Sequence, residues 1–227
     1  IRIGINGGSL EKDIKAKYGG VTAHGLAESA IRTVRSLERE SFSDIVISVK
    51  ASDVRLTVDA YTELDKLCGY PLHIGITESG AGTDAIIKSA AGIGGLLLAG
   101  IGDTIRVSLT GDPVREVMTG KSILRAVGLD KNYVEVVSCP TCARCFYDLE
   151  GLVGKCKALT DGVNKPLKIA VMGCVVNGPG EAADADVGIA GGRDKAVLFR
   201  KGKVIRTLPV AEAEEEFMRM VGELVRG

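Results

Sequence analysis

The chain has 227 residues, enough for one large domain or two smaller ones. Hydrophobic residues make up 45% and charged residues 26% of the chain, as in ordinary soluble globular proteins. Lys and Arg together number 29, as do Asp and Glu, so the net charge is zero. This balance argues against a bulk nucleic-acid binder, which carries a basic stripe, but leaves room for a local anion pocket.

Apolar, β-branched runs alternate with amphipathic segments through the first part of the chain. They predict strands over residues 1–6, 44–49, 72–77 and 104–109, and helices over 26–39, 53–67, 83–98 and 113–127. Asp112 and Pro113 form a typical helix start. A strand–helix series of this kind predicts an α/β fold with a parallel sheet and helices outside. Four such units make half of a (β/α)8 barrel.

The pattern changes near residue 131. Strands are predicted over 133–138, 167–172, 187–190, 196–200 and 203–207, and helices over 146–158 and 210–225. These elements predict a second, smaller α/β module. The boundary is expected between residues 128 and 132, which gives domains 1–129 and 130–227.

No apolar run is long enough to span a bilayer, and the most apolar stretch, residues 90–101, contains several glycines. Without a signal peptide, a cytoplasmic, reducing location is expected. The six cysteines are then more plausibly metal-binding or catalytic than paired in disulfides. Because the chain starts at Ile1 inside a predicted strand, we expect the C-terminal portion of a longer protein.

Polar side chains follow the predicted strands of the first module, where parallel α/β folds carry their chemistry. Arginine, lysine and neutral donors there predict an anion pocket formed by Arg2, Asn6, Lys50, Arg106 and Ser108. Glu78, beside these cations, could relay protons. The alternatives are rim salt bridges and, for Glu78, an ion pair with Lys50.

Cys139 and Cys142 follow a predicted strand with the spacing of a shared metal centre. This pair alone fits zinc, a redox dithiol or an iron–sulfur cluster. Cys145 extends the run as in bacterial ferredoxins, but the further cysteine of that pattern is absent, since Asp148 and Leu149 occupy the region. We therefore favour Cys145 as a bystander over a third ligand.

Cys174 is the stronger candidate for a third thiol, because it follows a predicted strand and enters a turn rich in Gly and Pro. Such turns let the backbone approach a bulky inorganic centre. Glu181 follows this turn and would be a hard, exchangeable ligand beside soft thiolates. The alternatives are a buried Cys packed as a small hydrophobe and a solvated Glu at a helix start.

The chain resembles the C-terminal portion of the 4-hydroxy-3-methylbut-2-enyl diphosphate synthase family, the iron–sulfur enzymes of the non-mevalonate isoprenoid pathway. The resemblance lies in the segments RIGINGGSL (2–10), VKASDV (49–54), GITE (75–78), GDTIRVSL (102–109), CPTC (139–142) and GCVVNGPGE (173–181). These segments occur in family order over nearly the whole chain.

The resemblance implies reductive ring opening and dehydration of 2-C-methyl-D-erythritol 2,4-cyclodiphosphate to 4-hydroxy-3-methylbut-2-enyl diphosphate. It implies a [4Fe–4S] cluster with ferredoxin or flavodoxin as electron donor. The balanced charge and the shortness of the apolar runs give the further expectation that neither nucleic acid nor membrane is a partner. It also implies a TIM barrel followed by a cluster domain that resembles a sulfite-reductase module, in a homodimer where one chain's cluster domain closes over the partner's barrel. The matching positions are Cys139, Cys142, Cys174 and Glu181 for the cluster, Arg2, Asn6, Lys50, Arg106, Ser108 and Asn177 for the substrate, and Glu78 for proton transfer.

Two departures from the family pattern affect what we expect. The chain lacks the first half of the barrel, so the isolated chain is expected to be an incomplete catalyst. Cys145 is an extra thiol that could mis-ligate iron or oxidise. Two other hypotheses stay open: a zinc-binding structural or interaction module using Cys139, Cys142, Cys145 and one more thiol, and a phosphate-sugar enzyme without a cluster.

Overall fold

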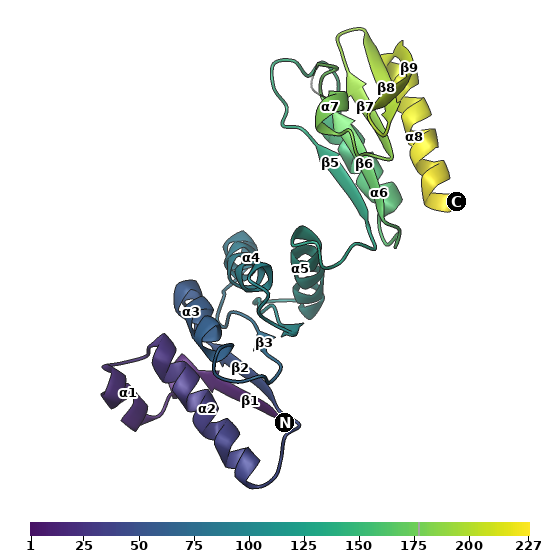
Figure 1. The fold of residues 1–227 in the computed structure, drawn as a ribbon. Coiled ribbons are helices and arrows are strands. Elements are labelled where there is room, and N and C mark those ends of the chain that lie inside the picture. Colours follow the sequence, from purple (N-terminus) through teal and green to yellow (C-terminus); the bar gives the residue numbers. More distant parts are fainter. Residues whose placement is uncertain (177) are drawn as a thin grey trace. The chain divides into compact units, whose positions relative to one another are not determined.

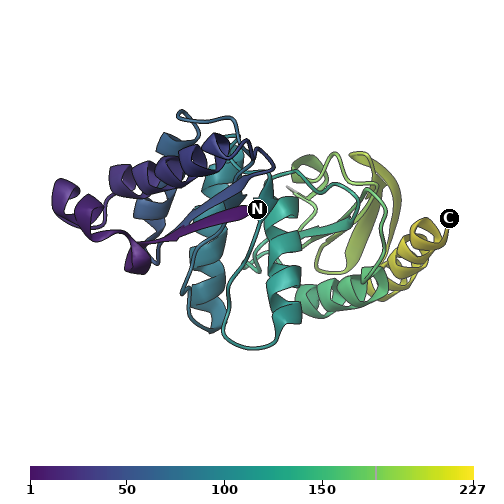
Figure 2. The same ribbon diagram turned by 90° about the horizontal axis from the view of Figure 1, so that it is seen from below.

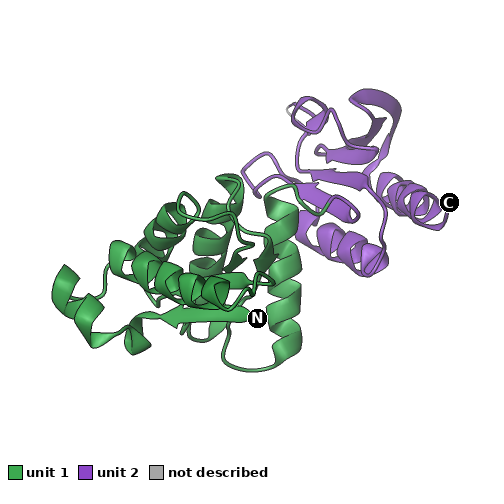
Figure 3. Ribbon diagram, turned by 60° about the horizontal axis from the view of Figure 1, so that its bottom comes forward, with its two compact units in different colours: residues 1–130 green, residues 131–227 purple. Residues whose placement is uncertain are grey.

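The computed structural model describes residues 1–176 and 178–227, and the chain divides into two compact units, residues 1–130 and 131–227 (Figure 3). Within the described ranges, no helix has both the length and the apolar character needed to cross a membrane. Both units mix helices and strands.

The first unit alternates strands and helices in chain order. Its strands are β1 (Arg2–Asn6), β2 (Val46–Lys50), β3 (His73–Ile74) and β4 (Thr104–Ile105). Its helices are the short 3-10 helix η1 (Gly7–Ser9) and α1 (Lys12–Tyr18), α2 (Ala23–Arg39), α3 (Val54–Leu64), α4 (Gly82–Leu98) and α5 (Pro113–Ala126). Asp112 caps α5 by accepting a hydrogen bond of 2.9 Å from the amide of Val114, so the predicted start of this helix is confirmed.

The strands of the first unit run parallel and neighbour one another in chain order. β1 pairs with β2, with Asn6 opposite Lys50, and β3 pairs with β4, with His73 opposite Thr104. A parallel bridge between Ile47 and Leu72 joins the two pairs. Side chains alternate along a strand, so most apolar residues of β1 to β4 lie on one face and most polar residues on the other, with Val46 as an apolar residue on the polar face.

The hydrophobic core of the first unit lies between the strands and helices α2 to α5. Figures 1 and 2 show these helices beside the strands, one after another in chain order. Ile3, Ile47 and Ile74 come from the strands and pack into one buried cluster with Leu26 of α2 and Tyr61 of α3. The opposite face of the strands carries Arg2, Gly4, Asn6, Ser48, Lys50, His73 and Thr104, and it is this face that holds the candidate anion site.

The last two strands are shorter than the sequence predicts. Extended segments were expected over 72–77 and 104–109, but β3 and β4 have only two residues each. One further hydrogen bond of 2.9 Å, from the amide of Arg106 to the carbonyl of Ile74, continues the pairing. Beyond it the chain turns at Glu78, whose φ is 53°, and β4 has no second neighbouring strand within the described ranges. Without that neighbour, half of its ladder bonds are missing.

The second unit is built on a single five-stranded sheet in the order β5-β6-β7-β8-β9. Its strands are β5 (Val134–Ser138), β6 (Leu167–Met172), β7 (Val187–Gly191), β8 (Lys195–Arg200) and β9 (Lys203–Pro209), and its helices are α6 (Leu149–Thr160), α7 (Gly178–Glu181) and α8 (Val210–Arg226). β5, β6 and β7 are parallel, whereas β8 and β9 are antiparallel to their neighbours. The carboxyl ends of β5 and β6 therefore meet at one edge.

Two hydrophobic clusters cover the faces of this sheet. Helices α6 and α8 contribute Leu152 and Phe217 to one cluster with Ile169 and Leu198, and a smaller cluster contains Met172 and Phe199. Helix α6 was expected to begin at residue 146 but begins at Leu149. The reason is the cap: the carboxylate of Asp148 accepts a hydrogen bond of 2.9 Å from the amide of Gly151.

Candidate functional site

Strands β5 and β6 bring the two cysteine-bearing loops to one edge of the sheet. Ser138 pairs with Val171, so the loops that begin at Cys139 and Gly173 leave adjacent strands side by side. The amide of Gly173 donates a hydrogen bond of 3.0 Å to the Sγ of Cys139. A Cβ on Gly173 would lie 3.4 Å from this Sγ and 3.2 Å from that of Cys145, so glycine permits the close approach.

The loops enclose a cavity of about 160 Å³. Its lining contains the three thiols and the carboxylate that the sequence singled out, together with one cation, namely Cys139, Pro140, Cys142, Arg144, Met172, Cys174, Gly178 and Glu181. Cys145 is absent from the described lining. Its amide instead donates to the carbonyl of Cys142 at 2.9 Å, and its thiol lies 3.5 Å from the carbonyl oxygen of Tyr147.

Arg144 sets the electrostatics of this cavity. Hydrogen bonds from its backbone amide and from its guanidinium lower the pKa of the Cys142 thiol. In turn, the hydrogen bond with Cys142 and the charges of Cys174, Cys142 and Glu181 raise the pKa of Arg144. Arg144 was not among the predicted site residues, although its place two positions after the CxxC pair is a signal in the sequence.

The donor set fits an iron–sulfur centre with one hard ligand. Thiolates are the usual ligands of such clusters, and a carboxylate is a harder donor. An amide that donates to a ligating sulfur is a typical second interaction around such a centre. No group of three His, Cys, Asp or Glu side chains in the described ranges is close enough to hold a single metal ion. The four donors line a space rather than meeting at a point.

The polar face of the first unit brings three cations together. Lys50 is only 7% exposed, and burial together with the charges of Arg2 and Arg106 lowers its pKa to about 8. Arg2 begins β1, but its Nη1 donates to the Oγ of Ser48 at 2.9 Å. The guanidinium passes over Gly4, where an added Cβ would lie 3.7 Å from both of these atoms. The predicted residues Arg2 and Arg106 thus lie close enough to Lys50 for their charges to act on it.

Gly75 and His73 complete this cationic face. A Cβ on Gly75 would lie 2.4 Å from the carbonyl oxygen of Arg106 and 3.4 Å from the Nζ of Lys50, so only glycine fits there. His73 pairs its Nδ1 with the Oγ1 of Thr104 at 2.8 Å. Burial and the charges of Lys50, Arg2 and Arg106 lower the pKa of His73. The position of His73 within a predicted strand gave no sign of its closeness to these cations.

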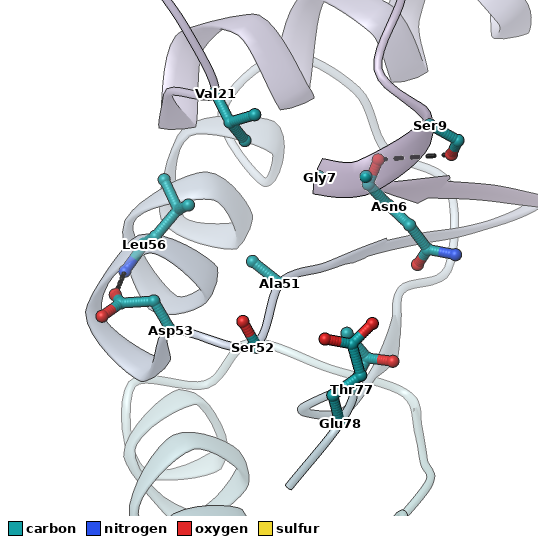
Figure 4. A pocket seen from close by; sticks show the side chains of 11 residues that line it. Asn6, Gly7, Ser9, Val21, Ala51, Ser52, Asp53, Leu56, Thr77 and Glu78 are labelled. Atoms are coloured by element: carbon teal, nitrogen blue, oxygen red, sulfur yellow. Dashed lines mark hydrogen bonds between the residues drawn. The ribbon is translucent and has the colours of Figure 1, made fainter.

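Asn6 and Glu78 lie in a neighbouring cavity of about 580 Å³, shown in Figure 4. Its described lining includes Gly7, Ser9, Ser52, Asp53 and Thr77. Asn6 is also in register with Lys50, at the same level of the sheet. No ion pair joins Glu78 to Lys50 within the described ranges.

Two predicted substrate residues, Ser108 and Asn177, remain to be located. Ser108 follows Arg106 by two positions and is half-buried, but it lines neither cavity as described. Asn177 lies outside the described residues.

Comparison with protein-family models shows to which family this chain belongs. Residues 1–121 match the GcpE TIM-barrel domain, and residues 135–223 match the C-terminal domain of the GcpE protein. The chain belongs to the GcpE family. The family resemblance seen in the sequence is therefore confirmed, and the α/β fold carries a TIM-barrel-family domain in its first unit.

Relatives of this GcpE chain carry the name 4-hydroxy-3-methylbut-2-en-1-yl diphosphate synthase (flavodoxin). The protein from Caldanaerobacter subterraneus is 54% identical over 100% of this chain, and that from Ruminiclostridium cellulolyticum is 53% identical over 99%. The protein from Clostridium tetani is 54% identical over 92% of the chain. The chain spans 64% of the length of the first two relatives and 60% of the third.

Proposed function

We propose that this chain is the C-terminal portion of a GcpE enzyme. The enzyme reductively opens 2-C-methyl-D-erythritol 2,4-cyclodiphosphate and removes water to give 4-hydroxy-3-methylbut-2-enyl diphosphate. The observation that carries the proposal is the shared cavity of Cys139, Cys142, Cys174 and Glu181 in a chain of this family. The names of the relatives support the reaction.

Cys139, Cys142, Cys174 and Glu181 would hold a [4Fe–4S] cluster. Bound there, the cluster would supply the two electrons of the ring opening. Glu181 differs from the thiolates because a carboxylate is a hard, exchangeable ligand, so its position is the one that can be vacated. The Gly173 amide helps fix the orientation of the Cys139 sulfur.

The cationic face of the first unit would bind the diphosphate. Arg2 and Arg106 offer planar forks of N–H donors, and Lys50 adds a point charge whose burial cost falls when an anion binds. Asn6 and Ser108 would add neutral donors, and Asn177 would be a further substrate-binding residue. Glu78 would hold or transfer a proton.

The wider architecture is part of the same proposal. The first unit would be the second half of a (β/α)8 barrel, and the second unit a cluster domain resembling a sulfite-reductase module. The active protein would be a homodimer, with flavodoxin as the electron donor that the relatives' names indicate and ferredoxin as the alternative. The free cysteines suit the reducing cytoplasm.

One observation favours a second candidate, a zinc-binding module. Cys145 and Cys139 both approach Gly173, so a closure of this loop onto Cys142 would give a thiolate site, although these three described thiols are not close enough for one metal ion in this structure. Counting iron, sulfide and zinc in protein purified without oxygen separates the two candidates. The cluster requires about four iron and four sulfide per chain, whereas stoichiometric zinc with sulfur ligation would favour the module.

The reaction itself is tested in the full-length protein. Reduced flavodoxin should support conversion of the cyclic diphosphate. Turnover by air-exposed, iron-free protein would contradict the proposal, because it would show that no cluster is needed.

A further inference from the structure

The cluster cavity contains a cation for which the proposed ligand set has no role. Among the described residues that line the cavity, Arg144 is the sole Lys or Arg, and it shares this lining with three thiols and a carboxyl group. The hydrogen bond from the Cys145 amide to the Cys142 carbonyl closes the turn that carries Arg144, which keeps this side chain beside the cavity. Its position is therefore set by the same loop that supplies two ligands.

Glu181 lines the same cavity, and its carboxylate has no hydrogen bond or ion pair to another described residue. Arg144 and Glu181 line the same cavity, yet they do not form an ion pair within the described ranges. The carboxylate can thus turn toward the metal space or toward the guanidinium. A guanidinium holds a carboxylate with two parallel hydrogen bonds, the strongest neutralisation a side chain offers.

We propose that Arg144 is a positioning residue for Glu181: its guanidinium holds the carboxylate whenever the carboxylate is not bound to the cluster. The inference rests on the proposed function, because it presupposes the cluster. The Glu181 carboxylate would then exchange between two partners, the cluster and the Arg144 guanidinium. Arg144 lowers the occupancy of the fourth ligand position by Glu181 and so leaves that position open to an incoming ligand.

The test measures ligand exchange rather than turnover. The cluster is reconstituted in the 227-residue chain and in Arg144→Gln, and cyanide is titrated into the reduced protein with electron paramagnetic resonance as the readout. The dissociation constant for cyanide should rise about tenfold in Arg144→Gln, because the carboxylate then stays on the iron. Arg144→Lys, which keeps the charge but loses the fork, should show a smaller rise.

A double-mutant cycle separates this role from a general effect of charge. In a Glu181→Ala background no carboxylate remains to be held, so Arg144→Gln should change cyanide binding little. An equal weakening in both backgrounds would show that Arg144 acts only through its charge and would overturn the inference. Arg193→Gln is the matched control, since Arg193 lies 5.0 Å from the ring of Phe146 in the same unit and should leave cyanide binding unchanged.

Failure of this inference can be told apart from failure of the proposed function. If the unmodified chain assembles no cluster, the proposed function fails. If the cluster assembles and Arg144→Gln binds cyanide as the unmodified chain does, the inference alone fails. Should Arg144→Gln bind less iron, Arg144→Lys supplies the comparison, and an unchanged dissociation constant there would contradict the positioning role.

Discussion

The amide of Gly173 donates a hydrogen bond to the thiol of Cys139, which is 34 residues earlier in the chain. The bond joins the ends of two parallel strands and so fixes one proposed ligand against the loop that carries another, Cys174. It also explains the glycine, because a side chain at this position would press on two sulfurs.

Gly173→Ala should weaken iron binding. The new Cβ would lie 3.2 Å from the Cys145 Sγ and 3.4 Å from the Cys139 Sγ, so at least one thiol must move. Disturbing a partner of a metal ligand typically lowers metal affinity by about tenfold or more. Iron release to a chelator measures the change. Gly154→Ala, where nothing lies within 4 Å of the new Cβ, is the control, and equal release from both variants would contradict the account.

Gly75→Ala should destabilise the first unit by about 1–3 kcal/mol. The added Cβ would lie 2.4 Å from the carbonyl oxygen of Arg106, so β3 and β4 must separate. Urea unfolding measures the loss, and Gly95→Ala, which meets no atom within 4 Å, serves as the control. A stability unchanged by Gly75→Ala would show that the two segments are not packed as described.

Lys50→Met should stabilise the chain near neutral pH, by about 1 kcal/mol. The pKa of Lys50 falls from 10.5 to about 8 in the folded chain. Between these values the unfolded chain binds more protons, so the lysine's contribution to stability improves as pH rises. The advantage of Lys50→Met should therefore shrink by about pH 9.5. Urea unfolding at both pH values tests this prediction. If Lys50→Met were less stable than the unmodified chain at both, burial of the Lys50 charge would not be what costs stability.

Diphosphate binding should weaken as the Lys50 amine loses its proton. An anion needs the charged form of Lys50, whose pKa in the folded chain is about 8. Relative to Lys50→Arg, which stays charged, the unmodified chain should lose up to about tenfold in affinity for pyrophosphate between about pH 7 and pH 9. Calorimetric titration of both proteins measures this, and the comparison cancels the ionisation of pyrophosphate itself. Parallel pH profiles would exclude Lys50 from the binding site.

The order of elements could be predicted from periodicity, because long apolar patterns in both units bury one face. The lengths of the strands could not be predicted in this way. The segments after Ile74 and Ile105 carry strand-like residues, yet they leave the ladder. A glycine and a turn follow β3, and β4 has no second neighbouring strand in the described part of the chain. Local propensity cannot show whether a strand has a partner on both edges.

The candidate site likewise contains residues that could be predicted from the sequence and residues that could not. Cys139, Cys142, Cys174 and Glu181 could be singled out because spacing and turn chemistry act within a few residues, and they share a cavity. Arg144 and His73 were missed because their importance lies in contacts across strands and loops. The low pKa of Lys50 likewise arises from burial and from Arg2 and Arg106, which are distant in sequence.

The most direct measurement is the iron and sulfide content of three proteins reconstituted without oxygen: the unmodified chain, Cys174→Ala and Cys145→Ala. The account predicts about four iron and four sulfide per chain in the first and third, because Cys145 does not line the cavity, and loss of the cluster in the second. A cluster that survives Cys174→Ala, or one that disappears with Cys145→Ala, would contradict the ligand set.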